Sequence, residues 1–188
     1  MNVAVKMASG DVIHFLNAGD RFDSKTVVSR AMNVMAEKSS DIVYGDVLYE
    51  NPDGTTDVRA YPQSCSSRLY YLTGDAINHQ VMFARRSLFE NNLFDTSFII
   101  CADREWMQRI GAYTPKRKMT ALSFVIARYP LDGVSVINKE LYKSEADACI
   151  KKYMPLGYPV YFIFEFFRSQ KKLSKWLHEL YKFLYYKN

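Results

Sequence analysis

A chain of 188 residues suits one domain, or one domain with a helical appendage, and its content of 48% hydrophobic and 15% aromatic residues can supply a sizeable core. This composition excludes disorder as a general description. The formal net charge is +5, but residues 158–188 hold +4 of it, from six basic and two acidic side chains. The nearly neutral body, residues 1–157, therefore argues against nucleic-acid binding.

The cysteines and the apolar stretches indicate the compartment. Cys65, Cys101 and Cys149 are scattered without CxxC spacing, which argues against a disulfide framework or a zinc site and favours buried free thiols in a reducing compartment. The first ten residues lack the apolar region of a signal peptide. The longest apolar stretch, Tyr158–Phe167, is far shorter than the roughly 20 residues of a membrane span. We expect a cytoplasmic protein, soluble or peripheral at the inner face of the cell membrane.

The first half of the chain alternates helical and strand patterns. The predicted elements are the end of a helix over Asn2–Met7, a buried strand over Asp11–Leu16, a turn over 17–20, a helix over Lys25–Lys38, a strand over Asp41–Tyr49 and its hairpin partner over Thr55–Tyr61. The helix has apolar residues on one face, and the turn signal of residues 51–54 separates the two hairpin strands.

The second half continues this alternation. It predicts a loop or short helix over 64–75, a strand over Ile77–Ala84, a helical turn over Ser87–Asn91, a helix over Asp103–Tyr113, a β-rich run over Lys118–Arg128, a helix over Asn138–Tyr153 and an amphipathic, basic and aromatic helical stripe over 158–188. Alternating strands and helices predict an α/β fold.

The first candidate for chemistry is Asn17-Ala-Gly-Asp20, which directly follows a buried strand. In open α/β sheets, ligands bind beyond the carboxyl ends of strands. A carboxylate placed there can hold a divalent cation, which neutralises a diphosphate as it leaves. Taken alone, however, Gly-Asp after a strand is more often only a turn.

A resemblance changes that balance. The run ASGDVIHFLNAGD (residues 8–20) resembles the segment A-x-G-[DE]-x-[IV]-x-F-L-[ND]-x-[GD]-D of family 2 glycosyltransferases, whose last part is an N-x-G-D form of the DxD motif. Further stretches are similar to later motifs of that family: DIVYGD (41–46), NHQ (78–80), FD followed by AD (94–95 and 102–103) and GVS (133–135). Each motif is weak, but they occur in the expected order.

The resemblance implies a partial GT-A fold that lacks its first βαβ unit, with residues 1–157 as the acceptor-side part and 158–188 as a helical tail. It implies the inverting transfer of a sugar from a nucleotide-diphospho-sugar to an acceptor hydroxyl, in bacterial surface polysaccharide or glycolipid assembly. The implied cofactor is Mn²⁺ or Mg²⁺, with Asp20 as metal ligand and Asn17 beside it on the donor side. A sheet without its first strands has an exposed edge that invites pairing with another copy of the chain.

The same resemblance places the catalytic base at Asp103. An inverting transfer needs a carboxylate that removes the proton of the acceptor hydroxyl. Spacing alone favours a different role, the N-cap of the helix that follows. Asp46, His79 and Gln80 fall at acceptor-side positions of the family, although a lone histidine in a strand is as often structural. Glu105 is expected only to complement the helix dipole.

Alternatives remain open for the chain and for its tail. The chain is either a transferase, whose activity without the first unit is open, or a non-catalytic binding module of the same fold. The tail can pack on the core, lie on an anionic membrane that presents a lipid-linked sugar acceptor, or bind nucleic acid. The family's acceptors favour the membrane.

Overall fold

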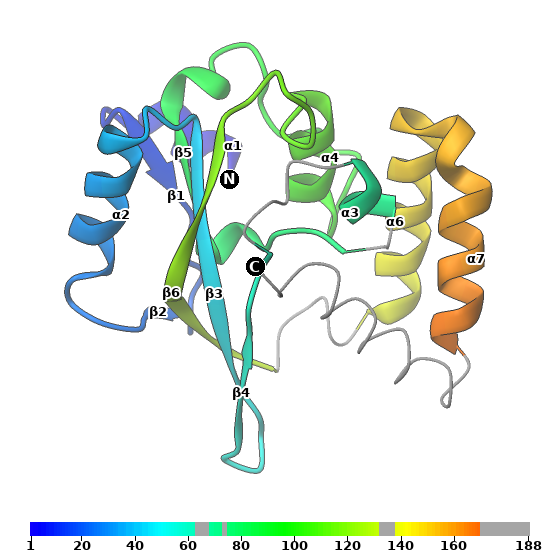
Figure 1. Cartoon of the computed structure of the whole chain (residues 1–188), viewed down its shortest axis with the longest axis horizontal. Coiled ribbons are helices and arrows are strands. Elements are labelled where there is room, and N and C mark those ends of the chain that lie inside the picture. Colours follow the sequence, from blue (N-terminus) through cyan, green and yellow to red (C-terminus); the bar gives the residue numbers. More distant parts are fainter. Residues whose placement is uncertain (63–67, 73–74, 132–137, 170–188) are drawn as a thin grey trace.

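The computed structural model of the chain describes residues 1–62, 68–72, 75–131 and 138–169. Its elements are α1 (Asn2–Met7), β1 (Val12–His14), β2 (Arg21–Phe22), α2 (Val27–Glu37), β3 (Ile42–Glu50), β4 (Thr56–Arg59), α3 (Arg68–Leu72), η1 (His79–Val81), β5 (Met82–Arg85), η2 (Arg86–Leu88), α4 (Ala102–Arg109), β6 (Met119–Pro130), α6 (Lys139–Tyr153), η3 (Pro155–Gly157) and α7 (Tyr158–Ser169). Helix α2 lies on one side of the sheet, and α4, α6 and α7 lie on the other (Figure 1). The predicted mixture of helices and strands is confirmed.

The described strands form one mixed sheet in the order β1-β5-β3-β6-β2, with β4 paired to β3. The central strand β3 runs parallel to β6 and antiparallel to β5 and β4. Ile42, Val43 and Tyr44 of β3 are all fully buried, so this strand is covered on both faces. The two strands that end the order, β1 and β2, are only three and two residues long. Short edge strands offer little backbone for pairing with another chain. Self-association through a sheet edge stays a prediction.

A glycine permits the close approach of β3 and β6. The register of this pair shifts around Asp46, at a bulge. A Cβ atom on Gly45 would lie 2.7 Å from both Ile126 Cγ1 and the Phe124 carbonyl oxygen. Only a residue without a side chain fits there.

The helices form where the sequence places apolar residues at helical spacing. In α2, Val27, Ala31 and Met35 lie four residues apart and are at most 3% exposed, so they make one face that packs on the sheet. The buried thiols of Cys101 and Cys149 belong to the same core, as the scattered cysteines predicted, and Cys65 lies outside the described residues. Burial raises the pKa of Cys101 to about 12 and that of Cys149 to about 11.

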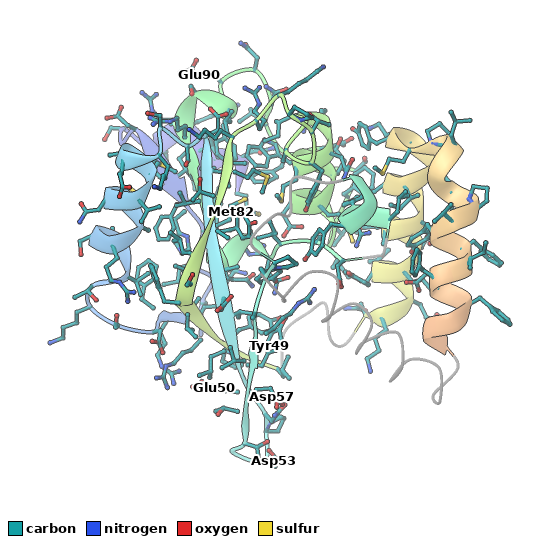
Figure 2. All side chains as sticks on the ribbon, viewed as in Figure 1. Tyr49, Glu50, Asp53, Asp57, Met82 and Glu90 are labelled. Carbon is teal, nitrogen blue, oxygen red and sulfur yellow. The ribbon has the colours of Figure 1, made fainter. Side chains whose placement is uncertain are left out.

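The predicted hairpin is confirmed, and it projects from the body of the molecule. β4 pairs antiparallel with the end of β3, from Val47↔Arg59 to Glu50↔Thr56. Tyr49, Glu50, Asp53 and Asp57 lie along this projection, away from the helices (Figure 2). Met82 instead lies within the body, where β5 begins.

One predicted strand is wrong in its first half. The pattern over Ile77–Ala84 predicted a continuous strand, but residues 79–81 form the 3-10 helix η1, and β5 begins only at Met82. The physical reason is a turn at Asn78, whose carbonyl accepts the N–H of Val81 at 3.2 Å and whose own N–H donates to the Tyr61 hydroxyl at 3.2 Å. This turn moves His79 out of the sheet.

The described part of the tail packs on the body. Helix α7 contacts α3 and α6, and its Tyr161 is 3% exposed and belongs to the core. The opposite side of α7 presents Phe162, Ile163 and Phe166, which are 61%, 52% and 56% exposed. Residues 170–188 and the predicted GVS motif at 133–135 lie outside the described residues. The division at residues 157 and 158 stays a prediction.

Candidate active site

The turn of residues 17–20 follows β1, as the sequence predicted. Its backbone closes through a hydrogen bond from Asp20 N–H to the Asn17 carbonyl at 3.1 Å, and Gly19 supplies a φ of +95°. The Asp20 carboxylate accepts the N–H of Asn17 at 3.3 Å. The metal candidate Asp20 and its neighbour Asn17 are thus held together in one tight turn.

Two other predicted site residues are connected to this turn, His79 directly and Asp103 through His79. The Nδ1 atom of His79 lies 2.8 Å from Oδ2 of Asp103, and its Nε2 atom lies 3.0 Å from Nδ2 of Asn17. We refer to these residues as the Asn17–His79–Asp103 row. Its members come from the turn after β1, from η1 and from the first turn of α4. The fold therefore connects the predicted donor side to the predicted base through one imidazole ring.

The contacts of Asp103 keep its carboxylate charged. Burial raises the pKa of Asp103, but the hydrogen bond and the charge of the His79 side chain, together with backbone hydrogen bonds from Arg104 and His79, outweigh it and hold this pKa below its ordinary value. Asp103 is therefore ionised at neutral pH and accepts a proton-bearing Nδ1 from His79. In a neutral imidazole the other ring nitrogen, Nε2, then accepts the hydrogen bond from the Asn17 amide.

The N-cap role weighed for Asp103 is wrong. Helix α4 begins at Ala102, so its N-cap is Cys101 and Asp103 is the second helical residue.

The segment that leads into α4 is held by Glu145 of α6, which is 8% exposed. Its carboxylate accepts the N–H groups of Ile99, Ile100 and Cys101 at 2.7, 2.8 and 2.8 Å. Sequence reasoning missed Glu145, because a helical glutamate carries no local signal of contacts more than 40 residues away.

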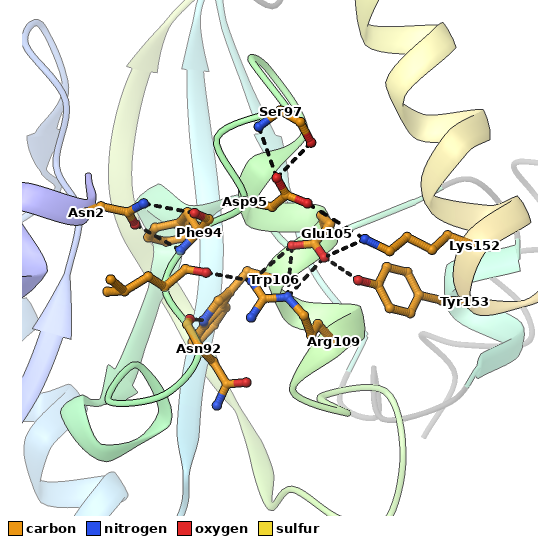
Figure 3. Close-up of polar contacts among 11 residues, drawn as sticks. Asn2, Asn92, Phe94, Asp95, Ser97, Glu105, Trp106, Arg109, Lys152 and Tyr153 are labelled. Carbon is orange, nitrogen blue, oxygen red and sulfur yellow. Dashed lines mark hydrogen bonds and ion pairs between the residues drawn. The ribbon is translucent and has the colours of Figure 1, made fainter.

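Glu105 does more than complement the helix dipole. It is fully buried, and its carboxylate accepts a hydrogen bond from Arg109 Nε at 3.0 Å and another from the Tyr153 hydroxyl (Figure 3). Lys152 Nζ lies 3.6 Å away. This cluster ties α4 to α6, so it fixes the helix that carries Asp103.

The other two acceptor-side candidates are not members of the row. Gln80 is only 5% exposed. Asp46 is half-buried, and burial raises its pKa although it accepts the N–H of Tyr61 at 3.0 Å. The Tyr61 hydroxyl in turn accepts the N–H of Asn78, next to His79. Asp46 thus reaches the row through two intermediate residues that sequence reasoning did not assign to the site.

His14, which the sequence analysis did not include in the site, has a structural environment. Its ring stacks on Phe83 with centroids 4.3 Å apart, and Nδ1 donates to the Met82 carbonyl at 2.9 Å. Burial lowers the pKa of His14, which favours the neutral ring in the folded chain.

Two larger features are absent from the residues that the structure describes. They contain no group of three or more His, Cys, Asp or Glu side chains placed to hold a metal ion. They also contain no helix with the length and hydropathy needed to cross a membrane.

Comparison with known proteins supports the interpretation of the fold. No protein-family model matches the chain. The crystal structure of Staphylococcus aureus TarS 1–349 is similar to this chain, with a TM-score of 0.55 and 17% identity. The match covers 90% of this chain and 51% of the TarS chain. The chain shares its fold with TarS. TarS 1–349 solved in complex with UDP matches 81% of the chain and 48% of its own, with a TM-score of 0.51 and 16% identity.

Sequence similarity adds two curated relatives from Mycobacterium tuberculosis. The chain is 30% identical over 110 residues to the uncharacterized glycosyltransferase Rv1514c of strain H37Rv and, equally, to the uncharacterized glycosyltransferase MT1564 of strain CDC 1551. The match covers 58% of this chain and 42% of each relative, so the chain spans less than half the length of the curated relatives it matches.

Proposed function

We propose that this chain is the acceptor-side part of a glycosyltransferase that uses a nucleotide-diphospho-sugar donor. The observation that carries the proposal is the Asn17–His79–Asp103 row, which connects the turn that holds the proposed metal ligand Asp20 to an ionised carboxylate. The partial similarity to glycosyltransferases and the fold shared with a protein solved with UDP support it.

The chemistry we propose is an inverting transfer. The acceptor hydroxyl gives its proton to the carboxylate of Asp103, and its oxygen attacks the anomeric carbon on the face opposite the diphosphate. The bond between that carbon and the diphosphate oxygen breaks, and the diphosphate leaves with the electron pair. Gln80 lies in η1 and Asp46 in β3, and both are proposed to shape the acceptor side.

The residues present fit a cation of the Mg²⁺ or Mn²⁺ type that a nucleotide brings with it. The turn offers one carboxylate, Asp20, and one amide oxygen, Asn17, and Mg²⁺ in nucleotide sites is commonly held by one or two carboxylates plus substrate phosphates. Such a site does not need the three-residue cage that the described residues lack. When bound, the cation supplies positive charge to the leaving diphosphate.

We further propose that α7 brings the protein to the surface of an anionic membrane that carries a lipid-linked sugar acceptor, in surface polysaccharide or glycolipid assembly. Phe162, Ile163 and Phe166 form an exposed apolar side on this helix. Residues 158–188 also carry most of the chain's net positive charge. Apolar and basic residues together favour the interface of anionic lipids.

The test is calorimetric titration with UDP in the presence and absence of Mn²⁺. We expect binding that depends on Mn²⁺ and is at least about tenfold weaker, or ~1.4 kcal/mol, in Asp20→Asn. The matched control is Asp11→Asn, an exposed aspartate before β1, which should bind like the parent. Equal binding by both variants would remove Asp20 from the donor site.

The alternative function, a non-catalytic binding module, makes a different prediction for turnover. Both functions allow UDP to bind, but only a transferase releases UDP from a UDP-sugar in the presence of an acceptor. Binding without release, across UDP-glucose and UDP-N-acetylglucosamine with simple glycoside acceptors, favours the module. Release of UDP that Asp103→Asn abolishes favours the transferase.

A further inference from the structure

The hairpin end of the sheet carries a pair of tyrosines that the proposed transfer does not use. Tyr49 and Tyr129 are register partners in the parallel strands β3 and β6, so their side chains lie on the same face of the sheet. Their rings meet edge to face, with centroids 5.8 Å apart and an interplanar angle of 73°. Both residues are only partly buried. We refer to them as the tyrosine pair.

The pairing of β2 with β6 places the donor turn at the same end of the sheet. Arg21 is the register partner of Arg128 in antiparallel strands, and Asp20 and Tyr129 are their neighbours toward this end. The strands β3 and β6 also reach their carboxyl ends here, shortly after the tyrosine pair. In open α/β sheets, ligands bind beyond the carboxyl ends of strands.

Asn78 connects the tyrosine pair to the Asn17–His79–Asp103 row. Its Nδ2 atom donates to the Tyr49 hydroxyl at 3.3 Å. The next residue, His79, is the central member of the row. A ligand that stacks on Tyr49 therefore borders the segment that contacts Asp103.

Polar side chains with unused hydrogen-bonding atoms border the tyrosine pair. Arg59 of β4 pairs with Val47, two residues before Tyr49, so it lies on the face that carries Tyr49. Its Nη2 atom donates to Oδ1 of Asp75 at 3.0 Å, and the two side chains are 35% and 29% exposed. Within the part of the chain that the structure describes, Nε and Nη1 of Arg59, Oδ2 of Asp75 and Oδ1 of Asn78 have no hydrogen-bond partner.

This combination of groups matches the chemistry of a sugar ring. A pyranose has a face of C–H groups, which packs on an aromatic ring, and a rim of hydroxyls, each of which donates and accepts hydrogen bonds. The tyrosine pair provides the aromatic surface. Arg59 provides donors, and Asp75 and Asn78 provide acceptors. Aromatic surface with a few placed polar groups is also the usual composition of a small-ligand site.

The charge of the hairpin restricts the class of sugar. Residues 46–59 contain four carboxylates and one guanidinium, and Glu50, Asp53 and Asp57 lie along the projection (Figure 2). Arg21 offsets Glu50, and Asp75 offsets the single guanidinium, so the hairpin stays negative. A phosphate or a uronic acid would meet like charge at this place. The hairpin therefore suits an uncharged ring.

We propose that the tyrosine pair, bordered by Arg59, Asp75 and Asn78, binds the uncharged pyranose ring whose hydroxyl receives the transferred sugar. This inference rests on the proposed transferase function and adds the class of its acceptor. The ring stacks on the tyrosines, and its hydroxyls bond to the three polar side chains. These residues determine which acceptor binds, and none of them takes part in the making or breaking of bonds.

The first experiment measures sugar binding without turnover. Saturation-transfer difference NMR on the full chain uses the methyl glycosides of glucose, galactose, mannose and N-acetylglucosamine as neutral probes, and methyl glucuronide and glycerol phosphate as anionic probes. We expect saturation of the ring C–H protons of at least one neutral probe and of neither anionic probe. Absence of transfer to every neutral probe would overturn the inference, and so would stronger transfer to an anionic probe.

Substitutions then locate the bound ring. Tyr49→Ala should weaken the affinity for the neutral probe about tenfold, whereas Tyr49→Phe keeps the stacking surface and should stay within about twofold. Arg59→Gln should also weaken it, and this variant decides the matter if thermal unfolding shows that Tyr49→Ala is not folded. The matched control is Val58→Ala, because Val58 is exposed on the opposite face of β4 and should be silent. Binding like the parent by folded Tyr49→Ala or Arg59→Gln would place the sugar elsewhere and overturn the inference.

Turnover separates this inference from the proposed function. With UDP-glucose or UDP-N-acetylglucosamine as donor, Tyr49→Ala should raise the KM of the glycoside acceptor about tenfold and leave kcat unchanged. A lower kcat at unchanged KM would overturn the inference, because Tyr49 would then act in the chemical step. Asp20→Asn should lose UDP and keep the glycoside. If the parent releases no UDP but still binds a glycoside through Tyr49, the transferase function fails and the sugar site stands.

Discussion

Replacement of Glu145 by glutamine tests how the N-terminus of α4, and with it Asp103, is held in place. The Glu145 carboxylate accepts three consecutive backbone N–H groups at 2.7–2.8 Å. Glutamine keeps the shape of the side chain and one acceptor oxygen. Its NH₂ group, however, must take the place of the other oxygen, and in the least costly orientation it faces the N–H of Ile99, so a donor meets a donor.

The structure gives the expected magnitude. A hydrogen bond to a charged group contributes about 1.5–3 kcal/mol, and loss of an acceptor leaves the buried donor unpaired. The Ile100 and Cys101 bonds can keep the amide oxygen as their acceptor, but they lose its negative charge. Ile99 is 73% exposed, so water can replace part of that bond. We expect Glu145→Gln to lower the free energy of unfolding by about 2–3 kcal/mol.

The assay is thermal and urea unfolding followed by circular dichroism. For a chain of this length, about 2–3 kcal/mol corresponds to a Tm lowered by about 4–12 °C. The control is Glu140→Gln. Glu140 is an exposed glutamate in the first turn of α6, the helix that also carries Glu145, and its replacement should cost less than about 1 kcal/mol. Equal effects of the two substitutions would refute the reasoning, because Glu145 would then contribute no more than a surface charge.

Three further predictions concern packing, pH and membranes. Gly45→Ala should destabilise the chain by about 1–3 kcal/mol in urea unfolding, because the added Cβ meets Ile126 at 2.7 Å. The folded pKa of His14 lies below its value of 6.5 in the unfolded chain. Stability should therefore fall as the pH decreases below about 6.5, by at most ~1.4 kcal/mol per pH unit, and His14→Phe should remove this part. Phe162→Ser with Phe166→Ser should weaken sedimentation with phosphatidylglycerol vesicles at least about tenfold, since a buried aromatic ring contributes about 1.5–3 kcal/mol.

Each of these predictions has a result that contradicts it. An unchanged urea midpoint for Gly45→Ala would mean that the two central strands can move apart. A difference in stability between parent and His14→Phe that does not vary from pH 7 to pH 5 would assign the pH dependence to other groups. Vesicle binding that the serine substitutions leave intact would remove the exposed side of α7 from the contact with lipid.

Local sequence patterns predicted most of the elements and their order. The hairpin of β3 and β4 carries its turn signal within four residues, 51–54, and α2 carries its apolar face within one window. Such features depend on neighbours along the chain, so a single sequence reveals them. The strand predicted from Ile77 failed because an apolar run does not distinguish a strand from a tight turn. The contact that bends the chain there comes from Tyr61.

The candidate site was predictable in its members but not in its connections. The motifs named Asn17, His79 and Asp103 separately, and the structure places them in one row. Their contacts join residues 62 and 24 positions apart, and no local pattern encodes which ring nitrogen faces which partner. Glu145 was missed for the same reason, because its role exists only after α6 packs beside α4.

The parallel pairing of β3 with β6 affects the order in which the chain can fold during its synthesis. The pairing begins at Ile42↔Met119, and His79 and Asp103 both lie in the segment it encloses. Closing so long a loop is entropically costly and slows folding. A nascent chain that ends before Met119 already contains every residue of the row, but β3 still lacks its parallel partner, β6. Until the ribosome completes β6, the edge of β3 that β6 occupies therefore stays unpaired and open to binding by chaperones.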